Sequence, residues 1–395
     1  MKIAFLCQSY PPMISGAAIV VQRLAEGLAQ RGHNVLVMAA SERGPAYTSN
    51  PPSGRGAGGE GETRSCLKIA RLQSIKNPFR VGQRAVLFPR AAVQRELQNF
   101  APEIVHAHDP VSVGLAGILA ARQLRIPAVL TIHQLPWFVT AYLPKFLGAP
   151  VERALWAYAR WLNQQVQAAI TPSKTIAEIV RAHGAGRPFA ISNGVDLERF
   201  TPLPASPHES DHLLKKYSLT PPIILHAGRL DADKKADLVL RAAARVPQAQ
   251  LLVVGDGTQR PALEKLAAQL NLKATFTGYV REELPALFRL AQVFVTASEV
   301  EIQSSVAMEA AASGVPVVAV RASSMAEFVQ EGVTGYLVPP RDVNALAARL
   351  MELLNNPQLA HNMGRAARQF AEMHSTERTV EAHEALYLQL TVHSK

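Results

Sequence analysis

The sequence predicts an α/β protein made of two doubly wound domains. Short apolar runs alternate with amphipathic stretches along the whole chain, this series occurs twice, and a turn followed by a proline-rich segment separates the two series. Runs rich in Val, Ile and Leu are typical of parallel strands that helices cover on both faces. The length of 395 residues exceeds what one ordinary domain holds, which also favours two sheets.

The first half contains five apolar runs that we expect to form parallel strands, at residues 3–7, 35–40, 104–108, 128–132 and 168–170. A helix is expected at residues 19–31, because Leu24 and Leu28 recur at four-residue spacing. Gly32 follows where that helix ends. Residues 42–64 are rich in Gly, Pro and Ser and predict a surface loop.

The second half repeats the pattern. Strands are expected at residues 223–227, 251–254, 274–276, 293–296 and 317–320, with helices such as 238–245 and 260–270 between them.

The two halves meet near residues 194–204. The triplet Ser-Asn-Gly that ends at Gly194 predicts a turn, and the Thr-Pro-Leu-Pro segment that follows predicts a stiff linker. We therefore expect a first domain at residues 1–197 and a second at residues 198–375.

Positive charge is concentrated in the first half. The formal net charge is +10, and residues 1–200 hold 22 Lys and Arg against 11 Asp and Glu, whereas residues 201–395 hold 19 against 20. Such an imbalance favours an anionic partner, such as a membrane surface, nucleic acid or a phosphorylated substrate. A basic surface that only keeps the protein soluble is the alternative. The sequence has no helix-turn-helix, zinc-finger or RNA-recognition signature, so we expect no nucleic-acid partner.

The sequence indicates a cytoplasmic location. Its two cysteines, Cys7 and Cys66, are too few for a disulfide framework. It has no uninterrupted apolar run of about 18–20 residues, and the apolar run after Lys2 is too short for a signal peptide.

Because open parallel sheets bind ligands at the carboxyl ends of their strands, the residues after each strand are the first candidates for a site. Small residues around Gly16 follow the first strand and precede a helix. Backbone N–H groups there can face an anion, although a plain strand–helix turn explains them equally well.

The strand at 223–227 is followed by Gly228, Arg229 and two lysines, Lys234 and Lys235. Arg229 and one of the lysines can clamp a diphosphate, and a solvated charge cluster is the alternative. Asp231 and the aspartate two positions later match the D-x-D pattern of metal-dependent sugar transferases, but the lysines compete with a divalent cation. We therefore expect no metal. The next strand is followed by another glycine turn, at Gly255.

After the strand at 293–296 come Glu301 and, eight positions later, Glu309 on a helix. Two carboxylates so placed can accept hydrogen bonds from sugar hydroxyls. Gln303, Ser304 and Ser305 lie at the helix start, where N–H groups favour a phosphate. The alternative is that these are ordinary acidic residues near a helix start.

Histidines end two strands of the first half. His106 and His108 have a spacing that suits a metal, but no further ligands accompany them, so packing is the better interpretation. His133 follows the strand at 128–132 and can hydrogen-bond a ligand or act as a base.

Residues 135–167 hold all three tryptophans with basic residues between them, which suits either a membrane interface or packing between helices.

Taken in order, these motifs resemble those of the retaining glycosyltransferases of family 4. The resemblance covers nearly the whole chain and implies the GT-B fold of two Rossmann-like domains. Its motifs are Pro11-Pro12 before Gly16, Gly228-Arg229 before Lys234, Gly255-Asp256-Gly257, and Glu301 ahead of Glu309 and Gly314-Val315-Pro316. The resemblance also implies that the last helix, in residues 376–395, crosses back to the first domain, which would bind the acceptor.

The resemblance implies a catalytic set of His133, Arg229, Lys234 and Glu301. Arg229 and Lys234 would hold the donor diphosphate, Glu301 the donor sugar and His133 the sugar near its reacting carbon. Glu309 would bind the ribose, and Gly16 the phosphates. The other implied donor-binding residues are Gly228, Gly255, Tyr279, Val280, Gln303, Ser304 and Ser305. The donor would be a UDP-sugar or a GDP-sugar, and neither a metal nor another cofactor is implied.

Two departures from the common family pattern refine the resemblance. Ser15 stands where most members have glycine, and Ile302-Gln303-Ser304 replaces a Phe-Gly pair. Together with the segment Thr-Ile-His-Gln-Leu-Pro around His133, the second departure resembles a branch that glycosylates diacylglycerol-type lipids. That branch implies glycolipid synthesis by a peripheral protein on the cytoplasmic face of the membrane. A small soluble acceptor, a nucleotide-sugar epimerase and a nucleotide-sugar-binding regulator are the alternatives.

Overall fold

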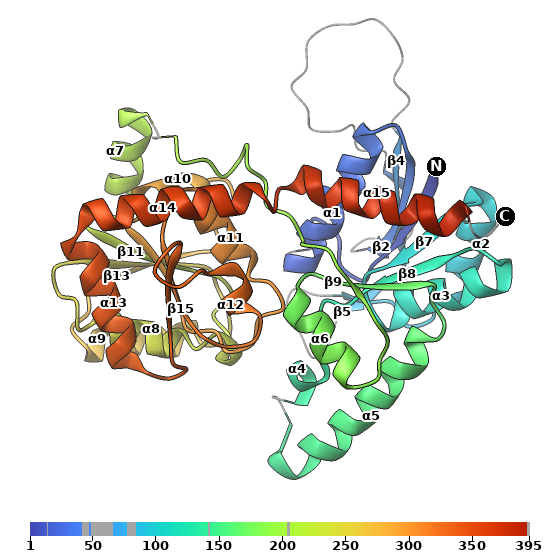
Figure 1. The fold of residues 1–395 in the computed structure, drawn as a ribbon, viewed down its shortest axis with the longest axis horizontal. Helices are drawn as coiled ribbons and strands as arrows, with labels where there is room; N and C mark the ends of the chain where they lie inside the picture. Colours follow the sequence, from blue (N-terminus) through green and yellow to red (C-terminus); the bar gives the residue numbers. More distant parts are fainter. Residues whose placement is uncertain are drawn as a thin grey trace, which may run out of the picture. The chain divides into compact units, whose positions relative to one another are not determined.

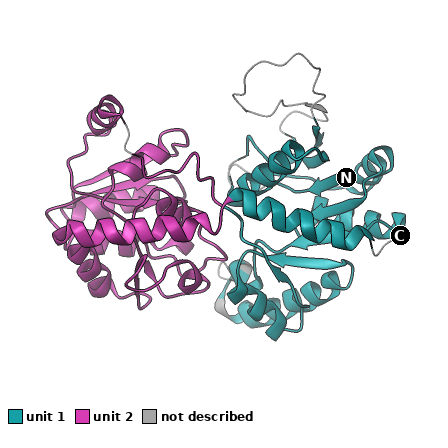
Figure 2. Ribbon diagram, turned by 45° about the horizontal axis from the view of Figure 1, so that its top comes forward, with its two compact units in different colours: residues 1–194, 376–395 teal, residues 195–375 magenta. Residues whose placement is uncertain are grey.

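The computed structural model describes residues 1–13, 15–41, 47–48, 66–76, 84–140, 143–203 and 206–392. Figure 2 shows the two compact units into which the chain divides. Unit 1 comprises residues 1–194 and 376–395, and unit 2 comprises residues 195–375. The chain thus passes from unit 1 to unit 2 after Gly194, close to the boundary expected at residue 197, and returns before Thr376.

Within the described residues, unit 1 contains an eight-stranded sheet in the order β10-β9-β8-β7-β1-β2-β4-β3, and all its pairs are parallel except β3 with β4. The strands are β1 (Lys2–Leu6), β2 (Asn34–Ala40), β3 (Tyr47–Thr48), β4 (Leu67–Leu72), β7 (Ile104–Ala107), β8 (Ala128–Thr131), β9 (Ala168–Thr171) and β10 (Phe189–Ala190). A separate two-stranded sheet pairs β5 (Ile75–Lys76) with β6 (Arg84–Ala85).

Helices cover both faces of this sheet (Figure 1). One face packs against α1 and α15, whose buried residues include Leu24 and Tyr387, and the other packs against α2 and α3 through residues such as Leu97 and Val113. The helices of unit 1 are α1 (Gly16–Gln30), α2 (Arg90–Phe100), α3 (Ser112–Leu124), α4 (Pro136–Thr140), α5 (Lys145–Asn163), α6 (Lys174–Ala182) and α15 (Thr376–Val392).

Unit 2 contains a parallel six-stranded sheet in the order β13-β12-β11-β14-β15-β16. The strands are β11 (Ile223–Ala227), β12 (Gln250–Val254), β13 (Ala274–Gly278), β14 (Val293–Thr296), β15 (Val317–Val320) and β16 (Gly335–Val338). The helices are α7 (Pro207–Lys216), the short 3-10 helix η1 (Ala232–Lys234), α8 (Ala236–Ala243), α9 (Arg260–Gln269), α10 (Leu284–Leu290), α11 (Ser305–Ala312), α12 (Met325–Phe328), α13 (Val343–Asn355) and α14 (Pro357–Glu372).

The apolar core of unit 2 forms two layers, one on each side of its sheet. One layer joins α10, α11 and α14 through residues such as Phe288 and Phe370, and the other joins α8, α9 and α13 through residues such as Leu240 and Leu346. The predicted α/β class with two doubly wound sheets is confirmed. Among the described residues, no helix is long and apolar enough to cross a membrane.

The order of strands reverses at one place in each sheet. In unit 1, β1 pairs with β2 on one side and with β7 on the other. In unit 2, β11 pairs with β12 on one side and with β14 on the other. Ligands of open parallel sheets bind outside the carboxyl ends of the strands at such a reversal. The loops after β1 and β7, and those after β11 and β14, are therefore where a site is expected in each unit.

Among the described residues, four strands of the two large sheets were absent from the sequence prediction, namely β3, β4, β10 and β16. Each is short or carries charged residues: β4 includes Lys68 and Arg71, and β10 has two residues. They form because neighbouring strands already present a free edge to pair with. The surface loop predicted at residues 42–64 lies outside the described residues, except for the short strand β3.

Candidate active site

Two glycines shape the carboxyl ends of β11 and β12. Gly228 has a φ of +144° and Gly255 a φ of +136°, values that residues with side chains rarely adopt. A Cβ at Gly255 would lie 1.9 Å from the carbonyl oxygen of Gly228, so the two loops pack backbone against backbone. A Cβ at Gly228 itself would meet nothing within 4 Å. The backbone at Gly228 is therefore open to a ligand.

Both cations predicted to bind phosphate have carboxylate partners in unit 2. Nζ of Lys234 lies 2.6 Å from Oε1 of Glu301, and both side chains are largely buried. Arg229, whose side chain is 55% exposed, donates to Asp231 and, at 3.0 Å, to Asp233. The sequence left open which of the two lysines faces the site, and the structure places Lys234 against Glu301.

The two aspartates of the D-x-D pattern bind protein groups. Asp231 accepts hydrogen bonds from the backbone N–H and the hydroxyl of Thr258, at 3.1 and 2.9 Å, which tie the loop after β11 to the loop after β12. Burial tends to raise the pKa of Asp231, but the bonds from Thr258 and the charge of Arg229 outweigh it and the pKa lies below its ordinary value. No group of three or more His, Cys, Asp or Glu residues in the described ranges is placed to hold a metal ion.

The loop after β14 leads into α11 through a polar and largely buried start. The Ser304 hydroxyl accepts from the N–H of Ala307 and caps the helix, one position before its first residue, Ser305. Gln303, Ser304 and Glu309 are each less than one-tenth exposed. An anion is favoured at such a helix start, because the first N–H groups of a helix lack intrahelical partners.

A buried serine fixes the backbone that carries Glu301. The Ser324 hydroxyl lies 3.0 Å from the carbonyl oxygen of Glu301 and 2.6 Å from that of Ile302. Ser324 is fully buried, so this anchor is protected from water. The Glu301 carboxylate is thereby held beside Lys234 rather than on a freely moving loop.

Tyr279 and Val280 follow β13, at the edge of the sheet. Tyr279 is 47% exposed, whereas Val280 packs against the core of unit 2. The N–H of Gly255 donates to the carbonyl of Gly278 at 2.8 Å, which ties this edge to the loop after β12. Because β12 lies between β13 and β11, these two residues are farther from the strand reversal than the other predicted residues of unit 2.

In unit 1, the loop after β1 ends at a capped helix start. The Ser15 hydroxyl accepts from the N–H of Ala18 at 3.0 Å, so the serine that departs from the family pattern caps α1. A Cβ at Gly16 would meet nothing within 4 Å. Asp109, after β7, accepts from the N–H groups of Gln8 at 2.9 Å and Gly114 at 3.3 Å. Burial raises the pKa of Asp109 to about 7, although these N–H groups oppose the shift.

His133 lies just after β8 and is partly buried. Its Nε2 lies 3.1 Å from Nδ1 of His108, which follows the neighbouring strand β7. Burial lowers the pKa of His133 to about 4, and the nearby His383 contributes to the shift. His133 is therefore neutral at physiological pH.

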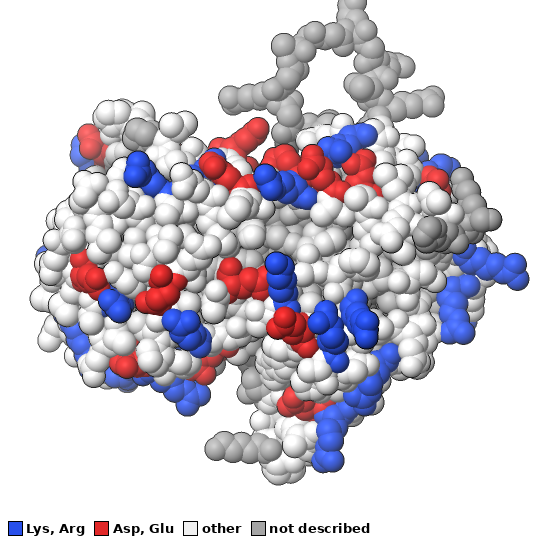
Figure 3. Space-filling view, in the orientation of Figure 1, with Lys and Arg blue, Asp and Glu red and all other residues white. Residues whose placement is uncertain are grey.

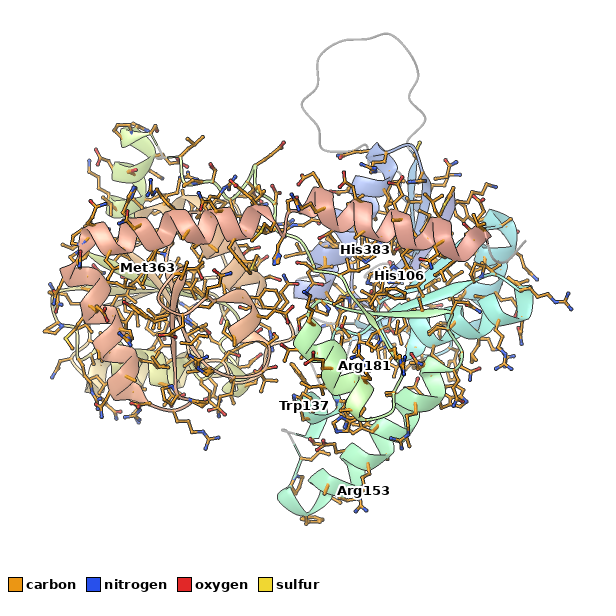
Figure 4. The ribbon with its side chains drawn as sticks, viewed as in Figure 1. His106, Trp137, Arg153, Arg181, Met363 and His383 are labelled. Atoms are coloured by element: carbon orange, nitrogen blue, oxygen red, sulfur yellow. The ribbon has the colours of Figure 1, made fainter. Side chains whose placement is uncertain are left out.

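His106 joins this group to the last helix. Its Nδ1 lies 2.5 Å from the Tyr387 hydroxyl and its Nε2 lies 2.7 Å from the Thr131 hydroxyl. Figure 4 shows His106 on β7 next to His383 on α15, and their ring centroids are 5.7 Å apart. These contacts agree with a packing role for His106, as the sequence indicated.

Sequence reasoning missed three residues that support the site. His108 contacts His133, and Asp109 holds the loop before Gly16. His226, at the end of β11, is buried and its Nδ1 lies 2.9 Å from the carbonyl oxygen of Val295 on β14. The pairing of consecutive strands was the signal available for His108, because it places their ends side by side.

Two units, each with a parallel sheet and with polar groups at the strand reversal, agree with the GT-B fold that the sequence predicted. The comparisons agree: residues 14–199 match the model of Glycosyltransferase Family 4, and residues 212–370 match that of Glycosyl transferases group 1. The GDP-mannose-dependent alpha-mannosyltransferase of Mycobacterium tuberculosis is 30% identical over 348 residues, which are 86% of this chain and 84% of that protein. The chain belongs to glycosyltransferase family 4 and is a glycosyltransferase.

Two further relatives are a sulfoquinovosyl transferase and a synthase whose name contains a diacylglycerol lipid. The sulfoquinovosyl transferase of Arabidopsis thaliana is 31% identical over 284 residues, which are 70% of this chain but only 54% of that longer protein. The alpha-monoglucosyldiacylglycerol synthase of Acholeplasma laidlawii is 25% identical over 404 residues, covering 99% of this chain and 97% of that protein. Among solved structures, the sucrose-phosphate synthase of Thermosynechococcus elongatus matches with a TM-score of 0.79 at 24% identity, and each chain is 99% covered. That likeness shows the GT-B fold.

Proposed function

We propose that this glycosyltransferase moves a hexose from a UDP-sugar or GDP-sugar to an acceptor hydroxyl, with retention of the anomeric configuration and without a metal ion. The ion pair of Lys234 and Glu301 at the strand reversal of unit 2 carries the proposal. The ammonium group suits a diphosphate, and the carboxylate suits a sugar hydroxyl. The name of the GDP-mannose-dependent relative supports a nucleotide-sugar donor.

In the proposed reaction, the bond between the sugar C1 and the phosphate oxygen breaks while the acceptor oxygen bonds to C1 on the same face. The acceptor proton passes to the departing phosphate oxygen. Arg229, Lys234 and the start of α11 stabilise the negative charge that develops on the diphosphate, the part that a divalent cation plays in other transferases. Glu309 binds the ribose. Arg229 is exposed enough to leave Asp231 and Asp233 when the donor arrives.

A donor screen followed by a transfer assay tests this function. A true donor at 100 times its dissociation constant should stabilise the protein by about 2.7 kcal/mol, measured as a thermal shift. The best donor is then incubated with diacylglycerol in mixed micelles, with and without a chelator, and the anomer of the product is assigned by NMR. The expected product is the α-glycoside from an α-linked donor, with no loss on chelation. An inverted product, or activity that only a divalent cation restores, contradicts the proposal.

We further propose that the acceptor is a lipid and that unit 1 binds an anionic membrane surface at the cytoplasmic face. The name of the glucosyldiacylglycerol relative supports a lipid acceptor. Exposed residues of α5 support the membrane proposal. Phe146 is 78% exposed and Trp161 is 41% exposed. Arg153 and Arg160 are exposed on the same helix. Figure 3 shows basic side chains over α5 and α6, and Figure 4 labels Arg153.

Part of the aromatic set packs inside the protein instead. Trp156 is only 5% exposed, stacks on His183 with 3.9 Å between ring centroids, and lies 6.1 Å from Trp137. The sequence left packing and membrane contact as equal alternatives; Trp156 packs inside the protein, whereas Phe146 and Trp161 are exposed. The side chain of Lys145 lies outside the described residues.

Co-sedimentation with vesicles of anionic and of neutral lipids tests the membrane proposal. Each basic residue near an anionic surface contributes about 1 kcal/mol, so binding should be strong at low salt and weak at high salt. The double variant Arg153→Glu with Arg160→Glu should bind less. Its matched control is Lys265→Glu with Lys273→Glu, which changes the same charge on exposed residues of unit 2. If the wild-type protein stays in the supernatant at low salt, a soluble acceptor takes the place of the lipid.

A further inference from the structure

His108 and His133 form a hydrogen-bonded pair at the ends of two neighbouring strands. Because β7 and β8 run parallel in register, the residues that follow them lie side by side. The two rings are stacked, with 5.4 Å between centroids and 21° between planes, and Nδ1 of His108 lies 3.1 Å from Nε2 of His133. A single hydrogen atom lies between these two nitrogens when both rings are neutral, and it belongs to one of them.

Both rings are neutral at physiological pH. Burial lowers the pKa of His133 to about 4 and that of His108 well below its ordinary value, and the neighbouring histidines His106 and His383 add to the effect. Burial raises the pKa of Asp109, the carboxyl group nearest in sequence to His108, to about 7. Each of the two rings therefore carries one proton, and the choice between the two tautomers decides what His133 presents to a ligand.

The surroundings of the other ring nitrogen of His108, Nε2, decide between the two tautomers. This nitrogen is buried and has no hydrogen-bond partner in the described part of the chain. If His133 were the donor, His108 would carry its proton on Nε2, as a buried N–H without a protein partner, which is a rare and costly arrangement. If His108 is the donor, its Nε2 carries no hydrogen. The second arrangement is the one that leaves no orphaned N–H.

The ring of His108 is also held in place. Phe5 lies on one side with 5.3 Å between ring centroids, and His106 lies at 4.0 Å. His106 cannot take over the contact with His133, because its own nitrogens face Tyr387 and Thr131. A positioning residue needs a hydrogen-bond donor that is already held in place, because such a side chain loses little conformational entropy when a ligand binds.

We infer that His108 is a positioning residue that donates from Nδ1–H to Nε2 of His133 and so keeps the His133 proton on Nδ1. His133 then meets the donor sugar as a hydrogen-bond donor and does not act as a base. This deepens the proposed function, on which it rests, and it takes the placement of the sugar near His133 from the family resemblance. It agrees with a reaction in which the departing phosphate takes the acceptor proton, because no base is then required of the protein.

Nitrogen NMR of the full-length protein with ¹⁵N-labelled histidine tests the tautomer directly. The signals of His133 are assigned by their loss in His133→Gln. We expect Nδ1 of His133 to have the shift of a protonated nitrogen and Nε2 that of a bare one at pH 7.5. The reverse pattern overturns the inference. This measurement needs no substrate, so its result does not depend on whether the proposed transferase reaction takes place.

Two substitutions at His108 test the consequence. His108→Asn keeps an N–H donor near the position of Nδ1, whereas His108→Leu removes it. One hydrogen bond is worth up to about tenfold in rate, so His108→Leu should lower kcat by about tenfold with an unchanged KM for the donor, while His108→Asn retains most of the rate. Equal losses in the two variants, or no loss in His108→Leu, contradict the positioning role. Melting temperatures of both variants report folding. A wild-type protein without transferase activity overturns the proposed function instead, and leaves the tautomer result intact.

Discussion

The two strand reversals of this molecule share a topology and differ in charge. At the reversal in unit 2, the polar groups form ion pairs: Arg229 faces two aspartates, and Lys234 faces Glu301. At the reversal in unit 1, the titratable groups are buried and close to neutral. The pKa of His133 is about 4, and that of Asp109 is about 7. One end is therefore suited to a charged diphosphate and the other to uncharged hydroxyl groups.

The difference shows what the fold decides and what the side chains decide. In both units a parallel sheet brings two loops together where the strand order reverses. In unit 2 the Lys234–Glu301 pair is largely buried and Arg229 is about half exposed, and each cation lies against a carboxylate. In unit 1 burial is the main cause of the pKa shifts of His133 and Asp109, so it disfavours their charged forms. The predictions below test whether unit 2 works through charge and unit 1 through neutral hydrogen bonding.

The largest effect is expected for Lys234→Ala. It removes a cation from the site of the developing diphosphate charge and leaves Glu301 without its partner. Loss of one such stabilising group costs about 100-fold to 1,000-fold in kcat, measured in the transfer assay. The matched control is Lys235→Ala, because the neighbouring lysine has no contact with Glu301 among the described interactions and should stay within about twofold of wild type. Equal losses in the two variants would mean that the wrong lysine has been assigned.

A smaller effect is expected for Arg229→Ala. Its side chain is 55% exposed, so it contributes less than a buried cation would. A charge-assisted contact of about 1.5–3 kcal/mol corresponds to a roughly tenfold to hundredfold weaker affinity for the nucleoside diphosphate, measured by calorimetry. Arg245→Ala, another exposed arginine of unit 2, is the control. An unchanged affinity in the Arg229 variant would remove this residue from the diphosphate site.

The neutral character of unit 1 predicts a pH-dependent stability. His383 has a pKa of about 4 in the folded state because of burial, against an ordinary value of 6.5. The unfolded chain therefore binds more protons between these values, and the free energy of unfolding falls as the pH is lowered, by about 1.4 kcal/mol per pH unit for this group. His383→Asn should make the slope between pH 6.5 and 4.5 shallower in urea titrations. An unchanged slope would show that His383 is not a source of the pH dependence.

Asp109 contributes with the opposite sign. Its pKa of about 7 in the folded state lies above the ordinary 3.8, so the folded state holds the proton more tightly. Its contribution to stability is fully present below pH 3.8 and is lost as the pH rises from there to about 7. Asp109→Asn should therefore remove a loss of stability between about pH 4 and 7, in the same titrations.

The smallest effect is expected for Gly16→Ala. The position is open, so the free energy of unfolding should not change. The added methyl group would hinder a close approach of phosphate to the backbone. The affinity for the donor should therefore fall by about threefold to tenfold. The control is Gly117→Ala, whose Cβ would lie 2.2 Å from a Leu6 methyl carbon. It should destabilise the protein by about 1–3 kcal/mol without a specific effect on donor binding. Unaltered donor affinity in Gly16→Ala would confine the donor site to unit 2.

The fold and the location of the site loops were predictable from the sequence. Buried parallel strands leave continuous apolar runs, and the residues that follow them are known once the runs are found. Gly228, Arg229 and Glu301 were singled out in this way. Edge and charged strands such as β4 and β16 were missed, because their pairing depends on a neighbouring strand and not on their own composition.

The partners of the site residues were not predictable. Lys234 contacts Glu301 across 67 positions of sequence, and His133 contacts His108 across 25. Such contacts depend on which strands become neighbours, which local pattern does not specify. The shared use of Arg229 by two aspartates also depends on the turn geometry of η1. The sequence identified the charged groups, and the structure showed which of them neutralise one another.

The last helix has a consequence for how this chain is made. Helix α15 belongs to unit 1, and its Tyr387 is a fully buried part of that unit's core. Unit 2 is continuous in sequence, whereas unit 1 is interrupted by the whole of unit 2. During synthesis, unit 2 is therefore complete as soon as residue 375 has left the ribosome.

Unit 1, although its first strand is made earliest, waits for residues 376–392 before its core can close. Until then, the apolar face of α1 that α15 covers stays exposed on a nascent chain already hundreds of residues long, a surface open to chaperones and to aggregation. Synthesis that stops before α15 would thus release a folded unit 2 attached to an incomplete unit 1.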